Sequence, residues 1–299
     1  MRSKLSNEMQ GILWILLNSF WFSVMTSIVR YIGADLNAFV VVFFRNIFAV
    51  PVIALLILPY RKNLFSFSRV KIHFPRACVA IFAMTLWFYT ITIMPLTEAV
   101  ALSFVTPLFT SIAAIIFLKE KAGYHRWTAL VIGFIGVLII LRPTPGHFNY
   151  ATIFVLITAL LWSASNLLAK RLTKTEHPNV IVFFLTLFMT LLSFPLAITH
   201  WQWPHPEQLI WLFILGVVSN FSHIALSKAI AKTDITVILP FDFTRLIFIS
   251  LISYFAFQQK PDIWTFVGGS IIILCTVYVA RREARIRKFA NVPKLNDIE

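Results

Sequence analysis

Long apolar segments separated by short polar connections follow one another along the whole chain. An α-helix needs about 20 mainly apolar residues to cross the hydrocarbon core of a bilayer, and each segment is close to this length. The connections are too short to form a soluble domain. The pattern predicts ten membrane-spanning helices, at residues 9–29, 37–58, 74–93, 96–118, 125–141, 149–169, 178–199, 207–227, 235–257 and 262–280.

The composition supports this all-α membrane fold. Of the 299 residues, 59% are hydrophobic and only 13% are charged, whereas about 25% of the residues of a soluble domain are charged. A water-facing surface cannot be built from this sequence. The segment at 9–29 is too long for a cleaved signal peptide and lacks a small-residue cleavage site, so it is expected to remain as the first helix.

The net charge of +14 would suggest nucleic-acid binding in a soluble protein. Here the positive residues lie in the connections, where they fix topology and meet anionic lipid headgroups, so no nucleic-acid partner is expected. With a cytoplasmic N-terminus, 21 of the 26 lysines and arginines fall on the cytoplasmic side and 3 on the other. This bias predicts that both termini, including the basic tail 281–299, are cytoplasmic.

The two halves of the chain resemble each other in order. The stretch "LTEAVALSFVTPLF" (96–109) aligns with "KTDITVILPFDFTR" (232–245), and further on Trp127 aligns with Trp264. Chance similarity between apolar segments is the alternative, but the tryptophans and acidic residues in register disfavour it.

Five helices per half make an odd number, so the second half must enter the membrane upside down. The chain is therefore predicted to be a 5+5 inverted repeat of residues 9–141 and 149–280. Inverted repeats are typical of secondary transporters, whose substrate site lies near the bilayer midplane between the halves.

The segment at 95–143 resembles the EamA-type domain of the drug/metabolite transporter superfamily. "FVVVFFRNIFAV" (39–50) is similar to the second helix of that domain, in which such proteins carry an arginine, here Arg45. The matching elements of the first segment are Pro107, Glu120, Trp127, Gly133 and Gly136.

The resemblance covers nearly all of the chain as two tandem domains. It implies a secondary transporter that works by alternating access, with a central cavity lined by the first four helices of each repeat. The second half departs from the pattern, because Gln258 and Gln259 stand where the first half has Glu120. Within the family, "FFRN" and "FDFTRL" most resemble bacterial S-adenosylmethionine uptake carriers.

Asp242 and Arg245 are the first candidates for a substrate site. They lie three apart on one face of a predicted helix, about 10 Å and 15 Å from its inner end. Burying either charge in lipid costs about 3 kcal/mol, which a chain normally accepts only for a function. The functional interpretation is that Arg245 receives a carboxylate and Asp242 an amine. The alternative is a structural ion pair.

Three further ionisable residues lie within the predicted helices. Arg45 is about 12 Å deep and would either face the cavity and bind substrate or extend to the outer surface. Glu98 begins the helix at 96–118, where it would act as a proton-coupling gate or as an ordinary helix cap. His223 would carry a coupling proton beside Asp242, or hydrogen-bond a neighbouring helix.

Uncharged candidates complete the predicted site. Trp21 and Trp162 are symmetry mates at mid-span that would form aromatic walls for a ring or a cation, or else pack in the interior. Asn18 and Asn166 would line the cavity or link helices. Prolines that would act as hinges, or as static kinks, are Pro51, Pro107, Pro195 and Pro240.

The sequence thus predicts a transporter and not an enzyme, without cofactor or metal, because it has neither a phosphate-binding loop nor a metal motif. The expected partners are a small polar, zwitterionic or cationic metabolite and an anionic bilayer, the bacterial inner membrane. The chain would act as a monomer or a homodimer. The alternative is a membrane enzyme or scaffold without transport, which would place a catalytic cluster at one face of the membrane.

Overall fold

The computed structural model describes residues 7–59, 67–117, 124–141, 150–173, 175–233, 238, 241–260 and 262–290. These residues contain helices and connections but no strand. The helices are α1 (Asn7–Ile32), α2 (Ala38–Ile57), α3 (Phe67–Ile93), α4 (Leu96–Ser103), α5 (Thr106–Phe117), α6 (Tyr124–Leu141), α7 (Ala151–Leu172), α8 (Pro178–Ile198), α9 (Pro206–Lys232), α11 (Thr244–Phe257) and α12 (Ile263–Ala290).

Each of the ten predicted segments contains helix, and an all-helical protein is confirmed for the described residues. By length and composition, six helices could cross a membrane, namely α1, α2, α3, α7, α8 and α9. The apolar stretches of α4–α5, α6, α11 and α12 are shorter.

The prediction of one continuous helix over 96–118 was wrong, because the helix breaks between α4 and α5 at Phe104 and Val105. Pro107 has no N–H to donate to the Ser103 carbonyl four residues earlier. The Thr106 hydroxyl donates to that carbonyl instead, at 2.6 Å. Pro107 therefore lies in the first turn of α5, where proline is tolerated, and not at a kink inside a longer helix.

The second half has a similar break. α11 begins at Thr244 after a turn at Phe243, and the Thr244 hydroxyl donates to the Phe241 carbonyl at 2.7 Å. Pro240, the predicted hinge of this segment, lies outside the described residues. The two breaks meet, because the rings of Phe104 and Phe243 lie edge to face at 4.8 Å.

The last helix extends beyond its predicted end at residue 280, into the predicted basic tail 281–299. α12 continues through residues 281–290, so only the last part of the predicted tail follows the helix. These ten residues are arginine, lysine, glutamate, alanine, isoleucine and phenylalanine, without proline or glycine, and most of them favour helix.

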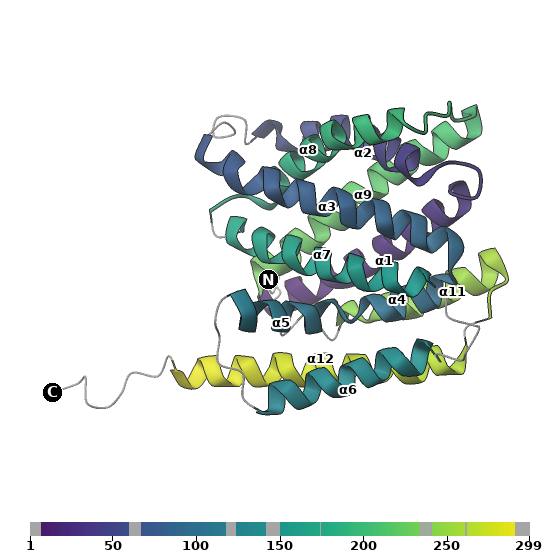
Figure 1. Ribbon diagram of the computed structural model, residues 1–299. Coiled ribbons are helices and arrows are strands. Elements are labelled where there is room, and N and C mark those ends of the chain that lie inside the picture. The colour runs from purple at the N-terminus through teal and green to yellow at the C-terminus, as the bar shows by residue number, and fades with distance from the viewer. Residues whose placement is uncertain are drawn as a thin grey trace, which may run out of the picture.

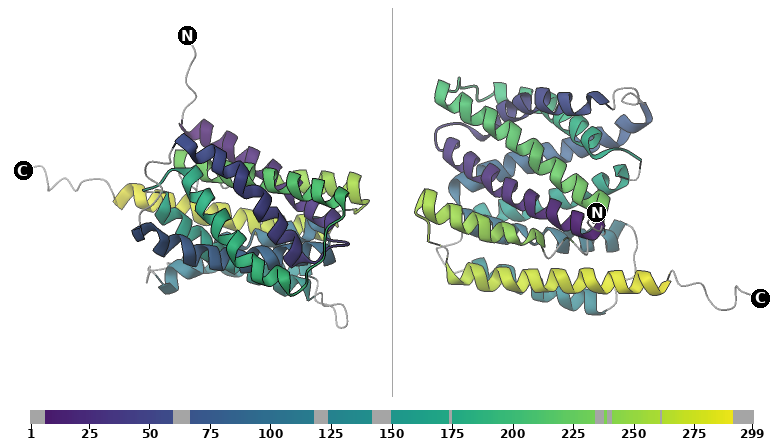
Figure 2. Two further views of the ribbon diagram at one scale, coloured as in Figure 1. Left: turned by 90° about the horizontal axis from the view of Figure 1, so that it is seen from above. Right: turned by 180° about the vertical axis from the view of Figure 1, so that it is seen from behind.

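The helices stack in layers (Figure 1). α6 and α12 lie together at one edge of the bundle, α2 and α8 form the opposite edge, and the remaining helices lie between them. Figure 2 shows that the start of α1 and the end of α12 lie at the same end of the bundle.

Packing partners are related between the two halves of the chain. α1 packs on α9 and α11, and α7 packs in the corresponding way on α3 and α5. α2 contacts α9 as α8 contacts α3, while α2 pairs with α8 and α6 with α12. When each helix is replaced by its counterpart in the other half of the chain, each of these contacts therefore becomes another contact of the same set.

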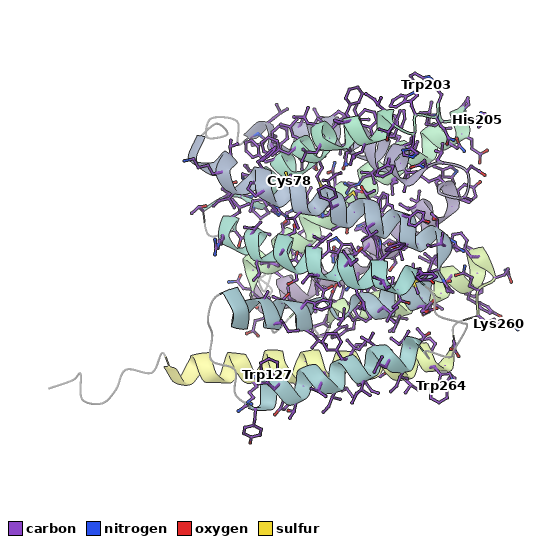
Figure 3. The ribbon with its side chains drawn as sticks, viewed as in Figure 1. Cys78, Trp127, Trp203, His205, Lys260 and Trp264 are labelled. Atoms are coloured by element: carbon purple, nitrogen blue, oxygen red, sulfur yellow. The ribbon has the colours of Figure 1, made fainter. Side chains whose placement is uncertain are left out.

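Aromatic and basic residues mark the two ends of the bundle (Figure 3). One end of the bundle holds Trp203, His205, Lys260 and Trp264. The other end holds Trp127 and the C-terminal end of α12. Trp127, Trp203 and Trp264 are all exposed. Tryptophans at both ends are typical of interfacial anchors of a membrane protein.

Candidate functional site

Asp242 and Arg245 form an ion pair at the start of α11. Arg245 Nη2 lies 3.4 Å from Asp242 Oδ2, and the side chains are 12% and 20% exposed for Arg245 and Asp242 respectively. The guanidinium carbon lies 5.1 Å from the ring centre of Phe22 and 4.7 Å from that of Phe104. The predicted shared face is therefore present, and the pair keeps some access from outside while two aromatic rings flank its cation.

Two serines of α1 hold this pair in place. The Ser19 hydroxyl lies 3.2 Å from the Asp242 carbonyl oxygen and 3.3 Å from Asp242 Oδ1. The Ser23 hydroxyl donates to the Ser19 carbonyl at 2.8 Å and lies 3.3 Å from the Arg245 carbonyl oxygen. Neither serine was predicted as a site residue. Their spacing of four residues, which continues to Ser27, puts three small hydroxyls along one face of α1, and this spacing is the signal that could have found them.

An aromatic group adjoins the ion pair. The ring centres of Trp87 and Trp162 lie 5.0 Å apart, and Phe22 lies 6.0 Å from each. Trp87 is 1% exposed, and its Nε1 has no hydrogen-bond partner among the described residues. Phe22 contacts both this tryptophan pair and Arg245, so the rings and the charges are in contact with one another.

Two predicted site residues lie elsewhere. Trp21 stacks on Phe221 with ring centres 5.7 Å apart and contacts Phe20, and both phenylalanines are exposed. Asn166 is exposed on α7. The structure therefore brings Trp162, but not its symmetry mate Trp21 or Asn166, to the ion pair.

Arg45 lies in the interior between α2 and α9 and does not extend to the surface. It is 1% exposed. Its Nε donates to Ser219 Oγ at 2.8 Å, and its Nη1 donates to Asn46 Oδ1 and contacts Met84 Sδ at 3.5 Å. All three partners are neutral, so the hydrogen bonds position the guanidinium without compensating its charge.

A polar seam connects Arg45 with the ion pair. Ser222, three residues after Ser219 on α9, donates to Asn18 Oδ1 at 3.0 Å, and Asn18 precedes the Ser19 that binds Asp242. Ser219 and Ser222 are three residues apart, which is about 4.5 Å along the axis of α9. The polar seam consists of Arg45, Ser219, Ser222, Asn18, Ser19, Asp242 and Arg245.

The remaining predicted residues differ in their surroundings. His223 on α9 has a buried Nε2 with no partner among the described residues. Glu98 lies in the first turn of α4, at the favourable end of the helix dipole for an acid. Pro51 and Pro195 lie exposed within α2 and α8.

Residues 9–142 and 149–281 each match the EamA-like transporter family. The S-adenosylmethionine uptake transporter of Rickettsia prowazekii is 32% identical over 285 residues, which cover 95% of this chain and 97% of the relative. The riboflavin transporter of Vibrio cholerae is 30% identical over 289 residues, which cover 93% and 95%. A solved crystal structure shares the fold, with a TM-score of 0.64 over 94% of this chain and 99% of that one at 17% identity.

The fold and these similarities define a multi-pass helical protein of the bacterial inner membrane. The chain belongs to the EamA-like transporter family, as its resemblance to that family predicted, and it is a transporter of a small metabolite.

Proposed function

We propose that the protein takes up S-adenosylmethionine, or a similar zwitterionic metabolite with a planar ring, as a secondary transporter driven without ATP. The observation that carries this proposal is the ion pair of Asp242 and Arg245 beside the mutually contacting rings of Phe22, Trp87 and Trp162. The substrates named for the two bacterial relatives both contain a planar heteroaromatic ring joined to a polar chain.

The chemistry of the site suits such a solute. The Asp242 carboxylate attracts a sulfonium or ammonium group, because an anion in a poorly hydrated site interacts strongly with a cation. Trp162, which is half-buried and backed by the buried Trp87, offers an apolar ring on which a heteroaromatic ring stacks. Arg245, flanked by Phe22 and Phe104, orients the carboxylate of Asp242.

Alternating access between two inverted five-helix repeats supplies the movement in this proposal. One support is that the two halves have related packing partners. Another is that the helix breaks at Phe104 and Phe243 contact each other. Broken helices at the repeat interface are typical binding elements of inverted-repeat carriers. The start of α1 and the end of α12 would face the cytoplasm, since they lie at one end of the bundle and the basic residues predict that side.

Flux of S-adenosylmethionine into proteoliposomes without ATP tests the proposal. Uptake of the labelled compound should saturate and should be competed by the unlabelled compound. No saturable flux, with an enzymatic activity retained in detergent, would favour the membrane enzyme instead.

Trp162→Leu should weaken the apparent affinity for S-adenosylmethionine by about tenfold, because base stacking on an aromatic ring contributes about 1–3 kcal/mol. The matched control is Trp21→Leu, which removes the related tryptophan of the other half, whose ring neighbours are exposed. The measurement is the KM of uptake by each variant. Equal changes in the two variants would contradict a specific role for the Trp87–Trp162 pair.

A further inference from the structure

The end of α11 is tied to the start of α4 by a glutamine that the proposed substrate site does not use. Gln259 Oε1 accepts from the Leu96 N–H at 3.3 Å and from the Ser253 hydroxyl at 2.9 Å. Leu96 and Ser253 are both fully buried. Because Gln259 and Leu96 belong to different repeats, the first of these hydrogen bonds joins the two halves of the chain. These two hydrogen bonds are called the Gln259 latch below.

The start of α4 needs an acceptor from elsewhere. The first N–H groups of an α-helix have no partner inside the helix, and Leu96 carries the first of them in α4. Pro95, the N-cap residue, makes no side-chain cap, since its ring has no acceptor atom. Gln259 therefore supplies, from the second repeat, an acceptor for the first backbone donor of α4.

The end of α11 is shaped around this glutamine. Gln258 has a φ of 54°, the one positive value at a non-glycine residue within the described ranges, and an L-residue adopts this left-handed conformation at a cost. The turn lets the backbone N–H groups of Gln258 and Gln259 both donate to the Ser253 carbonyl. The sequence marks the same place, because these two glutamines depart from Glu120 of the first half.

The same two helices meet again at the ion pair. α4 packs on α11. Just after α4, the ring centre of Phe104 lies 4.8 Å from that of Phe243 and 4.7 Å from the guanidinium carbon of Arg245. The eight residues of α4 rise about 12 Å. The α4–α11 interface therefore runs from the Gln259 latch at one end to the charged site at the other.

The latch lies at the end of the bundle opposite to the end of α12. Lys260, which directly follows Gln259, lies at this end together with His205 and Trp203 (Figure 3). The distribution of basic residues predicts that this end faces the outside of the cell. A solute that approaches between α4 and α11 from outside would therefore meet the latch before it meets the ion pair.

We propose that the Gln259 latch is the outer gate of the carrier, which holds α4 against α11 and must break before solute from outside reaches Asp242. The inference rests on the proposed function, in particular on alternating access. A gate has to open at little cost, and the latch consists of neutral hydrogen bonds, each of which changes an equilibrium by about two- to tenfold. Thr97 Oγ1, next to Leu96, is buried without a partner among the described residues. Water that enters on opening would bind this hydroxyl and offset part of the loss.

The test measures how fast a membrane-impermeant thiol reagent modifies Asp242→Cys in a protein whose Cys78 and Cys275 are replaced by serine. The reagent is added to sealed vesicles that expose either the outer or the cytoplasmic face. Gln259→Leu keeps the approximate size of the side chain but removes the acceptor. It should raise the rate from the outer face by about two- to tenfold and should not raise the rate from the cytoplasmic face, because it favours the outward-open state alone.

Gln208→Leu is the matched control. Gln208 Oε1 also accepts from a backbone N–H at a helix start, that of His205 at 2.8 Å, but both residues belong to the start of α9 and join no two helices. This variant should leave both rates unchanged. Gln259→Glu keeps an acceptor at the start of α4, where a negative charge is favourable, so it should not raise the rate from the outer face.

Ser253→Ala keeps the proposal testable if Gln259→Leu does not fold. It removes only the hydroxyl that orients Gln259 Oε1, so it should raise the rate from the outer face by a smaller factor. Unchanged rates in the folded variants would overturn the gate. Equal rises from both faces would also overturn it, because they would show a general loosening of the bundle.

The outcome for the gate is separate from the outcome for the substrate, because the thiol reaction needs no transported compound. A rise from the outer face alone, in a protein that takes up no S-adenosylmethionine, would support the gate and contradict the proposed substrate. Saturable uptake of S-adenosylmethionine by a protein whose Gln259→Leu variant shows unchanged rates would support the proposed function and overturn the gate.

Discussion

Arg245→Gln should reduce uptake by about 100-fold or more, because it leaves the Asp242 carboxylate without its cation in a largely buried place. Removing one partner of a buried pair costs about 3–5 kcal/mol, although the partial exposure of this pair, 12% and 20%, places it below that range. Asp242→Asn should have a similar effect, since it removes the charge that attracts the cationic solute. The measurement is the initial rate of S-adenosylmethionine uptake into proteoliposomes.

Lys228→Gln is the matched control for the loss of a cation beside an aromatic ring. The Lys228 ammonium lies 4.3 Å from the ring centre of Trp14 near the end of α9, outside the polar seam. Its uptake rate should stay close to that of the wild type. Full uptake in both Asp242→Asn and Arg245→Gln would contradict a role of the ion pair in transport and would show that the pair only helps to hold α1 against α11.

Gly216→Ala should destabilise the protein, because α9 has no room for a side chain where it crosses α2. A Cβ at Gly216 would lie 2.9 Å from the Arg45 carbonyl oxygen and 3.0 Å from the Ala49 amide nitrogen. These are backbone atoms, so α2 itself would have to move. Overpacking of this kind costs about 1–3 kcal/mol, which corresponds to a fall in Tm of several degrees, at about 2–4 °C per kcal/mol.

Gly269→Ala provides the control within the same fold. A Cβ there would meet Ala101 Cβ at 3.6 Å and Leu246 Cδ2 at 3.7 Å, which are ordinary contacts. Its Tm should stay unchanged or rise, because alanine favours helix over glycine by about 1 kcal/mol. The measurement is thermal unfolding in detergent. Equal Tm values for the two variants would show that the α2–α9 crossing is looser than the structure indicates.

Most of the helices could be predicted from the sequence, because a chain in lipid must satisfy its backbone hydrogen bonds within each segment. The shared face of Asp242 and Arg245 also follows from a spacing of three residues. The break at Phe104 and Val105 does not follow from hydropathy, since both residues are as apolar as their neighbours. It depends on the missing N–H of Pro107 and on the hydroxyl of Thr106.

The residues that complete the site depend on contacts between helices. Arg76 lies near the start of the predicted helix 74–93 and within α3, and the sequence does not show that its side chain is only 8% exposed there. Trp87 joins Trp162 because α3 packs on α7. His223 lies within α9, but a single sequence does not show that its Nε2 is buried without a partner among the described residues.

The central claim is that water and solute reach the charges of α11 in the middle of the bundle. In a protein whose two free cysteines, Cys78 and Cys275, are replaced by serine, the rate at which a membrane-impermeant thiol reagent modifies Asp242→Cys tests this claim most directly. Ile249→Cys, on the same helix at a position that is 0% exposed, is the reference. The account predicts rapid modification at 242 and none at 249; a rate at 242 no faster than at 249 would contradict it.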